Sequence, residues 1–260
     1  LTALIVFHIV LVSKTNEKTV LHQHIKNEYE AGNLPIKYEQ QGRVLDLGCG
    51  TGANTEALSK IISNSLIVAI DRSPQQLSYA VAQNVGGVIY IPIPFEDFSY
   101  SNYDFVLASH VLQYIDTDPK SFIRKMIDAL STDGEAWIVQ QTRKGMYEII
   151  SHQKAFLTNP RFNTWLTLED YIKMVDEIGF TYRLQLLPTS IDGINFENPS
   201  EEDRRRLEFM FCLDQGFDQQ PAEFKSHLSK LTSGRKIYHP NGIIKIRRRK
   251  FDTIPKWEKN

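Results

Sequence analysis

The residues best placed to do chemistry lie in the segment 44–52, which reads VLDLGCGTG. An apolar run that carries Asp46 leads into a turn with glycines at 48, 50 and 52. Glycine lets a backbone turn sharply and approach a ligand closely, because no Cβ stands in the way. The spacing is not the G-x-G-x-x-G of dinucleotide sites, and Asp46 suits an ammonium or sulfonium charge better than a pyrophosphate. We expect a cofactor at Asp46, Gly48, Gly50 and Gly52; a bare structural turn is the alternative.

Two more polar residues follow the next apolar run, LIVAI. Asp71 directly follows that run. A carboxylate at such a strand end can accept hydrogen bonds from both hydroxyls of a ribose. Gln76 lies one turn into the helix expected next and can reach the same sugar. We therefore predict that both residues contact the cofactor. The alternative for Asp71 is a solvated acid at a strand end.

The segment after the third expected strand reads IPIPFED and is a candidate base-binding loop. Phe95 can pack on a purine face, and Glu96 or Asp97 can accept a hydrogen bond from its amino group. A proline-stiffened loop that offers only backbone contacts is the alternative. Ser109 and His110 stand at the end of the fourth expected strand, and imidazole, the side chain of His110, is a group that can titrate near physiological pH in general.

These residues are positioned by strands that alternate with helices from Arg43 onward. Strands are expected over 44–47, 66–70, 87–91, 103–109 and 136–140, helices over 54–62, 74–83 and 118–130, and a turn at Asp133–Gly134. Continuous apolar strands separated by helices predict an α/β fold with a mostly parallel sheet and helices on both faces. The carboxyl ends of such strands form the binding crevice, so the candidate residues should meet there.

The last third of the chain is less regular. It predicts a helix over 168–178, a strand over 180–187, arginine-rich helical sequence over 195–220 and a strand over 243–246. We interpret 188–235 as a helical insertion on the substrate side. The expected organisation is an N-terminal lid or pocket segment (1–42), a cofactor-binding core (43–187) and a substrate-side region with the terminal strand (188–260).

Composition limits the remaining possibilities. The chain has 260 residues, 42% hydrophobic and 23% charged, which suits a globular protein with a sizeable core. A net charge of −1 disfavours a nucleic-acid partner, so the basic run 245–250 predicts a solvated face or a protected sheet edge. The apolar segment 1–12 is shorter than the roughly 20 residues that span a bilayer. With two cysteines in all, a reducing cytoplasm is the expected location.

A metal site is not expected. His22 and His24 are two positions apart, which puts them on different faces of a helix. No cluster of cysteines or carboxylates in the sequence completes a ligand set with them.

The glycine segment resembles the first motif of the class I S-adenosylmethionine-dependent methyltransferases, and the resemblance covers roughly 43–187. It implies a Rossmann-like fold with a seven-stranded sheet, S-adenosylmethionine as cofactor and methyl transfer as the reaction. It also implies that Ser109 and His110 lie near the transferred methyl group. His110 is then the candidate catalytic residue, accepting or relaying the proton that leaves the acceptor.

The segment 165–196, WLTLEDYIKMVDEIGFTYRLQLLPTSIDGINF, resembles the histamine N-methyltransferase family. That family grips its substrate with a glutamate, a glutamine and an asparagine, which match Glu17, His110 and Asn241 here; His110 departs from the pattern. Tyr114 and Trp165 fall on aromatic positions of the pocket. The resemblance implies a small amine or imidazole-containing acceptor. Methylation of oxygen or carbon, and a cofactor-binding module without catalysis, are the rival hypotheses.

Overall fold

The structure is a computed structural model that describes most of the chain. The described residues are 16–36, 41–99, 101–115, 117–145, 147–148, 151, 166–192, 194–195, 198–210, 213, 216–231 and 236–248. The apolar segment 1–12, Trp165 and the end of the basic run lie outside these ranges. The chain divides into two compact units that interleave along the sequence. Unit 1 comprises 1–24, 140–169 and 186–242, and unit 2 comprises 25–139, 170–185 and 243–260.

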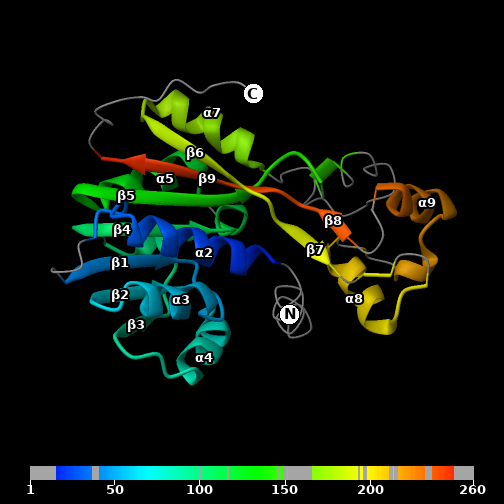
Figure 1. The fold of residues 1–260 in the computed structure, drawn as a ribbon, viewed down its shortest axis with the longest axis horizontal. Helices are drawn as coiled ribbons and strands as arrows, with labels where there is room; N and C mark the ends of the chain where they lie inside the picture. Colours follow the sequence, from blue (N-terminus) through cyan, green and yellow to red (C-terminus); the bar gives the residue numbers. More distant parts are fainter. Residues whose placement is uncertain are drawn as a thin grey trace. The chain divides into compact units, whose positions relative to one another are not determined.

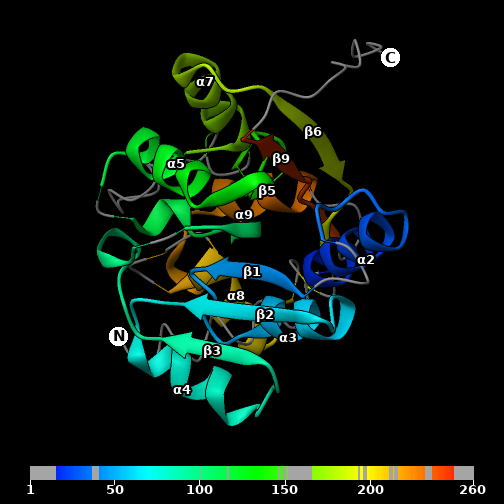
Figure 2. The same cartoon turned by 90° about the vertical axis from the view of Figure 1, so that its left-hand side faces the viewer.

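A seven-stranded sheet organises the fold, in the order β3-β2-β1-β4-β5-β9-β6. Strands β1 to β4, with β1 and β2 side by side in Figure 2, lie wholly in unit 2. The pairs β1–β2, β1–β4, β2–β3 and β4–β5 are parallel, which confirms the predicted α/β fold with a mostly parallel sheet. The strands are β1 (Gly42–Leu47), β2 (Ser65–Ile70), β3 (Val88–Ile91), β4 (Tyr103–Ser109), β5 (Leu130–Gln141), β6 (Tyr182–Leu187) and β9 (Asn241–Arg247).

Helices connect the parallel strands, as parallel pairing requires. Ser73 caps α4 by accepting a hydrogen bond from the Gln76 amide, and Asp118 caps α5 by accepting one from the Ser121 amide. Each of these two helices begins with a proline, whose missing N–H costs nothing there. The helices are α2 (Glu17–Glu30), α3 (Ala53–Ile61), α4 (Pro74–Ala82), α5 (Pro119–Asp128) and α7 (Leu168–Ile178), with short 3-10 turns η1 (Phe95–Asp97) and η2 (Leu112–Tyr114).

Unit 1 contains the predicted helical insertion and two strands that the sequence did not predict. Its helices are α8 (Glu201–Met210), η4 (Phe217–Gln219) and α9 (Ala222–Leu231). Strands β7 (Ser190–Asp192) and β8 (Lys236–Tyr238) pair antiparallel as a separate two-stranded sheet (Figure 1). Each strand has three residues, too few for an alternating pattern to stand out.

The predicted turn at Asp133–Gly134 is wrong, because β5 runs without interruption from Leu130 to Gln141. The pairing of β4 with β5 shifts register between Tyr103 and Phe105. A Cβ on Gly134 would lie 2.6 Å from the carbonyl oxygen of Tyr103. Glycine is needed here for close approach of two strands at an irregular pairing, not for a reversal of the chain.

The basic run does not form a solvated face at Lys245, which is buried. Its Nζ lies 3.2 Å from a carboxylate oxygen of Glu28 and 4.4 Å from the centre of the Trp137 ring. Burial lowers the pKa of Lys245, and the charge of Glu28 opposes that shift. Next to it, Arg247 Nε pairs with Glu135 Oε2 at 2.6 Å, and Trp137 Nε1 donates to Glu135 Oε1 at 2.6 Å. This part of the run therefore stabilises the core of unit 2.

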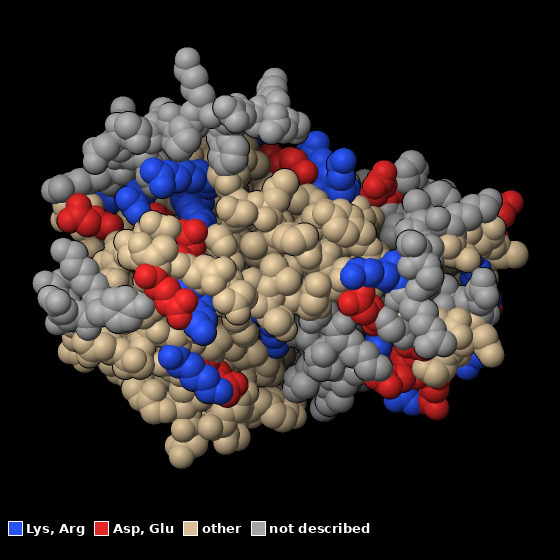
Figure 3. Space-filling view, in the orientation of Figure 1, with Lys and Arg blue, Asp and Glu red and all other residues tan. Residues whose placement is uncertain are grey.

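On the face drawn in Figure 3, Lys and Arg side chains lie beside Asp and Glu side chains at several places. Surface ion pairs such as Lys60–Glu56 and Lys26–Glu30 join neighbouring turns of single helices. Among the described helices, none is both long and apolar enough to cross a bilayer.

Replacing Glu135 with leucine should lower the free energy of unfolding by about 3 kcal/mol, because Arg247 and the Trp137 indole both lose a buried acceptor. Urea unfolding followed by fluorescence would measure the change. Glu30→Leu is the matched control, since Glu30 makes only an exposed pair with Lys26 and should cost less than about 1 kcal/mol. Equal effects of the two variants would contradict a structural role for the Glu135 network.

Candidate active site

The glycine turn at the end of β1 combines two tightly packed glycines with one that faces open space. Gly48, Gly50 and Gly52 have φ values of 66°, 55° and 84°, a region that other residues rarely adopt. A Cβ on Gly48 would clash with the Val111 side chain, and one on Gly52 would meet α4 at 2.8 Å. Around Gly50 the nearest atom is Gln76 Oε1 at 4.0 Å. Gly50 is thus where a ligand can approach the backbone.

Asp71 braces this turn from the end of β2. Its Oδ2 accepts a hydrogen bond from the Gly50 amide at 2.9 Å, and its Oδ1 accepts one from the Ser73 amide at 2.8 Å. A carboxylate has about four acceptor positions, so two remain for a ligand. Asp71 therefore fixes the conformation of the loop that carries Gly50, and both residues are predicted to contact the cofactor.

Asp46 lies beneath the turn and is 1% exposed. Its Oδ2 accepts a hydrogen bond from Thr55 Oγ1 at 2.6 Å. Burial raises the pKa of Asp46 to about 6; the charge of Asp71 adds to the shift and the Thr55 hydrogen bond opposes it. The same burial raises the pKa of Cys49, so this thiol stays protonated and is not a nucleophile. A positive charge above the turn would favour the ionised form of Asp46.

Unpartnered polar atoms occur on α4, β3 and η1, the elements that follow β2 along the chain. Gln76 Oε1, Tyr90 Oη and Glu96 Oε1 are buried and have no hydrogen-bond partner within the described part of the chain. Tyr90 Oη would lie 3.4 Å from a Cβ on Gly52. Buried polar atoms are nearly always paired, so these three indicate where a ligand would supply hydrogen bonds. Tyr90 was not predicted, because within the apolar strand VIYI it is indistinguishable from a core residue.

The predicted base-binding loop is held in place by Lys125. Its Nζ donates to the carbonyl oxygens of Phe95 at 3.1 Å and of Glu96 at 2.6 Å. The Phe95 ring is buried with its centre 3.8 Å from that of Phe122. Asp97 is exposed, whereas Glu96 carries a buried oxygen without a partner. Of the two predicted acids, Glu96 is the better placed acceptor.

Ser109 and His110 follow the pattern expected for the end of β4. Ser109 is the last residue of the strand, and the His110 amide donates to the Val139 carbonyl at 3.0 Å. His110 has a φ of 53°, which is uncommon for a residue with a side chain and is often found at functional sites. Tyr114, in η2, is 50% exposed, and its carbonyl accepts a hydrogen bond from Arg72 Nη1 at 3.3 Å.

The predicted substrate residues Glu17 and Asn241 belong to unit 1. Glu17 is the first residue of α2, although its side chain lies outside the described atoms. The preceding residue, Asn16, is joined to β7: the Ser190 amide donates to Asn16 Oδ1 at 2.7 Å. Asn241 is the first residue of β9 and is fully buried. The fifth predicted substrate residue, Trp165, is outside the described ranges.

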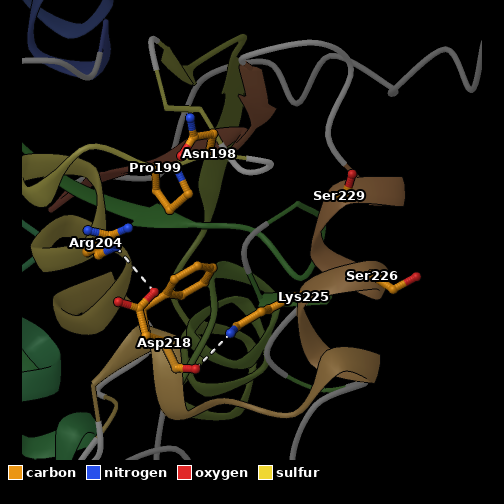
Figure 4. Close-up of a pocket in the computed structure, with 8 residues that line it drawn as sticks. Asn198, Pro199, Arg204, Asp218, Lys225, Ser226 and Ser229 are labelled. Carbon is orange, nitrogen blue, oxygen red and sulfur yellow. Dashed lines mark hydrogen bonds and ion pairs between the residues drawn. The ribbon is translucent and has the colours of Figure 1, made fainter.

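Unit 1 also contains a polar pocket of about 450 Å³ that none of the predicted site residues lines (Figure 4). Its charged groups pair with one another: Arg204 Nε lies 3.2 Å from Asp218 Oδ1, and Lys225 Nζ donates to the Asp218 carbonyl at 2.8 Å. Elsewhere in the described ranges, no three His, Cys, Asp or Glu side chains are grouped as a metal site would need.

Known sequences show a similarity that covers the glycine turn and most of the parallel strands. Residues 45–138 match the family described as methyltransferase domain. Over 94 residues the chain is 35% identical to a malonyl-acyl-carrier-protein O-methyltransferase of Bacillus anthracis and 33% identical to that of Bacillus cereus. The alignment covers 35% of this chain, and the chain spans about a third of the length of these curated relatives.

Solved structures extend the similarity to most of the fold. The plantazolicin methyltransferase BpumL in complex with SAH superposes with a TM-score of 0.55 at 16% identity, over 90% of this chain and 84% of that one. A putative methyltransferase of Bacillus halodurans gives 0.54 at 18% identity, over 80% and 93%. The protein thus has the class I methyltransferase fold, as the first motif predicted.

Gly50→Ala should leave the fold intact but weaken binding of S-adenosylhomocysteine by at least about tenfold, because the new methyl group fills the space where a ligand approaches the backbone. Titration calorimetry would measure the affinity. Gly32→Ala is the matched control, since Gly32 has a φ of 69° with nothing within 4 Å and reports backbone strain alone. Equal affinity losses in the two variants would remove Gly50 from the site.

Asp46→Asn should alter how stability depends on pH. The folded protein protonates Asp46 at about 6 and the unfolded chain at about 3.8, so between these values the folded state binds more protons. Wild-type stability should therefore fall by about 2 kcal/mol as pH rises from 4 to 6, relative to the variant. Urea unfolding at several pH values measures this difference; parallel curves for the two proteins would contradict it.

Proposed function

We propose that this chain is an S-adenosylmethionine-dependent methyltransferase that acts on a nitrogen of a small amine or imidazole-containing molecule. The observation that carries the proposal is the glycine turn braced by Asp71, with an open approach at Gly50 and the unpartnered Gln76 Oε1 4.0 Å from a Cβ placed there. Glu96, in η1, carries a further unpartnered oxygen. The matched methyltransferase domain and the SAH complex of a protein with the same fold support the choice of cofactor.

The residues around the turn fit the parts of this cofactor. Asp71, with two free acceptor positions, and Gln76, with its unpartnered Oε1, accept hydrogen bonds from the ribose hydroxyls. Glu96 accepts a hydrogen bond from the adenine amino group. Phe95 contacts the adenine base with the part of its ring that does not pack against Phe122. Asp46, ionised beneath Gly48–Gly52, offsets the positive charge of the methionine portion.

The bound cofactor supplies a methyl group on a sulfonium, which is already activated for in-line displacement. The protein's task is then to position the acceptor, to exclude water and to manage one proton. His110, held beyond Ser109 in a left-handed conformation, accepts or relays the proton that leaves the acceptor nitrogen. Imidazole titrates near physiological pH, so it can take up this proton and release it to solvent.

We assign substrate binding to the residues that the family resemblance indicates. Glu17 pairs with a distant ammonium, which leaves a second, neutral nitrogen to react. Asn241 binds a polar group of the acceptor, which its burial and lack of a partner support. Tyr114 and Trp165 line the pocket, with ring faces that favour cationic groups. His110 in place of the family's glutamine favours an acceptor other than histamine itself.

Methylation of oxygen is the second candidate. It is favoured by the curated relatives, which are O-methyltransferases of a malonyl-acyl-carrier protein and match 94 residues of the chain. That match lies in the part of the fold that would bind the cofactor, so it bears less on the acceptor. The two candidates share every cofactor contact above and differ in the group that His110 would face.

A methyl-transfer assay separates these alternatives. S-adenosylmethionine would be incubated with histamine, other imidazole amines, simple amines, phenols and a short-chain malonyl thioester, and mass spectrometry would identify the methylated product and S-adenosylhomocysteine. A methylated amine or imidazole supports the proposal, and an O-methylated product or malonyl ester supports the second candidate. Binding of S-adenosylhomocysteine without turnover of any acceptor would indicate a cofactor-binding module and overturn both.

His110→Ala should lower kcat at least about 100-fold with the accepted substrate, because it removes the proton acceptor, while affinity for S-adenosylhomocysteine stays within about twofold. Asp71→Ala should show the opposite pattern, a loss of cofactor affinity, because both the brace of the turn and the ribose contact disappear. Steady-state kinetics and calorimetry on both variants make the comparison. Unchanged turnover in His110→Ala would remove it from the chemistry.

A further inference from the structure

Two buried amide side chains in unit 1 stand at the ends of neighbouring strands. Gln141 is the last residue of β5 and is 2% exposed; Asn241 is the first residue of β9 and is 0% exposed. The Thr142 amide, just after β5, donates to the Pro240 carbonyl, just before β9, at 3.0 Å. The end of one strand therefore meets the beginning of the other, so the two run antiparallel here.

This pairing places the two amides opposite each other. A hydrogen bond from Thr142 to Pro240 sets Gln141 directly across from Asn241 as a non-hydrogen-bonded pair of an antiparallel ladder. Side chains in such a pair lie on the same face, with Cβ atoms about 4.5–5.5 Å apart. Their amide groups can thus reach a common ligand.

Neither amide is fully used by the fold. Within the described residues, Gln141 Nε2 and both amide atoms of Asn241 are buried without a hydrogen-bond partner. Polar groups beside them are satisfied: Gln140 Nε2 donates to the Leu166 carbonyl at 3.1 Å, and its Oε1 accepts from the Gln141 amide at 3.3 Å. Leaving a buried polar atom unpaired is costly, so this local exception calls for a partner that binds from outside the chain.

The unpartnered atoms define the chemistry of that partner. Gln141 Nε2 and Asn241 Nδ2 are donors, Asn241 Oδ1 is an acceptor, and both groups are uncharged. A carboxylate would satisfy the donors but oppose the acceptor, and an ammonium would do the reverse. A carboxamide or lactam both accepts and donates, so it satisfies atoms of both kinds.

We infer that Gln141 and Asn241 together bind an uncharged carboxamide or lactam group of the methyl acceptor. The inference rests on the proposed function in one respect, that the ligand is the methyl acceptor. It deepens that function by adding Gln141 to the site and by naming a substrate class. The pair itself is a property of unit 1 and can be tested without cofactor or turnover.

The test follows side-chain amides in the full, ¹⁵N-labelled chain by NMR. The signals of the two NH₂ groups are assigned by their loss in Gln141→Met and Asn241→Leu, and the wild type is titrated with acetamide, acetate or methylammonium. Both NH₂ groups should shift saturably with acetamide and less with either ion. In Gln141→Met, acetamide should bind Asn241 about 3- to 10-fold more weakly, the value of one hydrogen bond. The inference would be overturned by equal responses to the three probes or by a larger response to an ion. It would also be overturned by no response, the result expected if the site holds only a structural water.

Thermal unfolding provides an independent readout with a matched control. Gln141→Met should keep or raise Tm, because it removes an unpartnered buried amide, whereas Gln140→Met should lower Tm, because that amide is bonded within the fold. A fall in Tm for Gln141→Met equal to that of Gln140→Met would assign Gln141 a structural role and overturn the inference. Acetamide binding without methyl transfer to any acceptor would count against the proposed function alone, and methyl transfer without acetamide binding would count against this inference alone.

Discussion

The hydrogen bond from the Gly50 amide to Asp71 is the interaction on which the site depends. It joins the turn after β1 to the end of the neighbouring parallel strand β2, at the edge where open α/β sheets bind ligands. The adjacent Cys49 amide donates to the Ile70 carbonyl of β2 at 2.9 Å, and the bond from Gly50 adds a carboxylate acceptor, which fixes the turn more firmly than a neutral one would. Asp71 also accepts from Ser73, which caps α4, so a single side chain orients the turn, the strand end and the next helix.

The burial of Asp46 affects the charge near the hydrogen bond between Gly50 and Asp71. Asp46 is withdrawn from water, which raises its pKa, and the charge of nearby Asp71 adds to that shift. The protein thereby keeps a negative charge beneath the turn that is poorly compensated by its own groups. A cationic ligand above the turn would relieve that imbalance, which explains physically why a sulfonium or ammonium compound suits this cradle better than a pyrophosphate.

The sequence predicted elements with strong periodicity and missed those fixed by tertiary contacts. The bounds of strand 103–109 and helix 168–178 were predicted to the residue. The strand is a nearly continuous apolar run, and the helix has an amphipathic pattern of helical period. Gly134 was misread as a turn because close approach to Tyr103 leaves no trace in local sequence. Lys245 was misread as solvated because its partner Glu28 is more than 200 residues away. Among the candidate site residues, the glycines and Asp71 were proposed from sequence spacing, whereas Tyr90 and Gln141 become candidates only when unpartnered atoms are located in space.

The strand order has a consequence for how the chain is synthesised. In the sheet, β9 lies between β5 and β6, although it is the last of the three to leave the ribosome. Until residues 241–247 emerge, β5 presents an unpaired edge and β6 has no neighbour on that side. A nascent chain that ends before residue 241 is therefore a prime target for chaperones that cover strand edges, and a message cut short before this strand should give an aggregating product rather than a smaller folded protein.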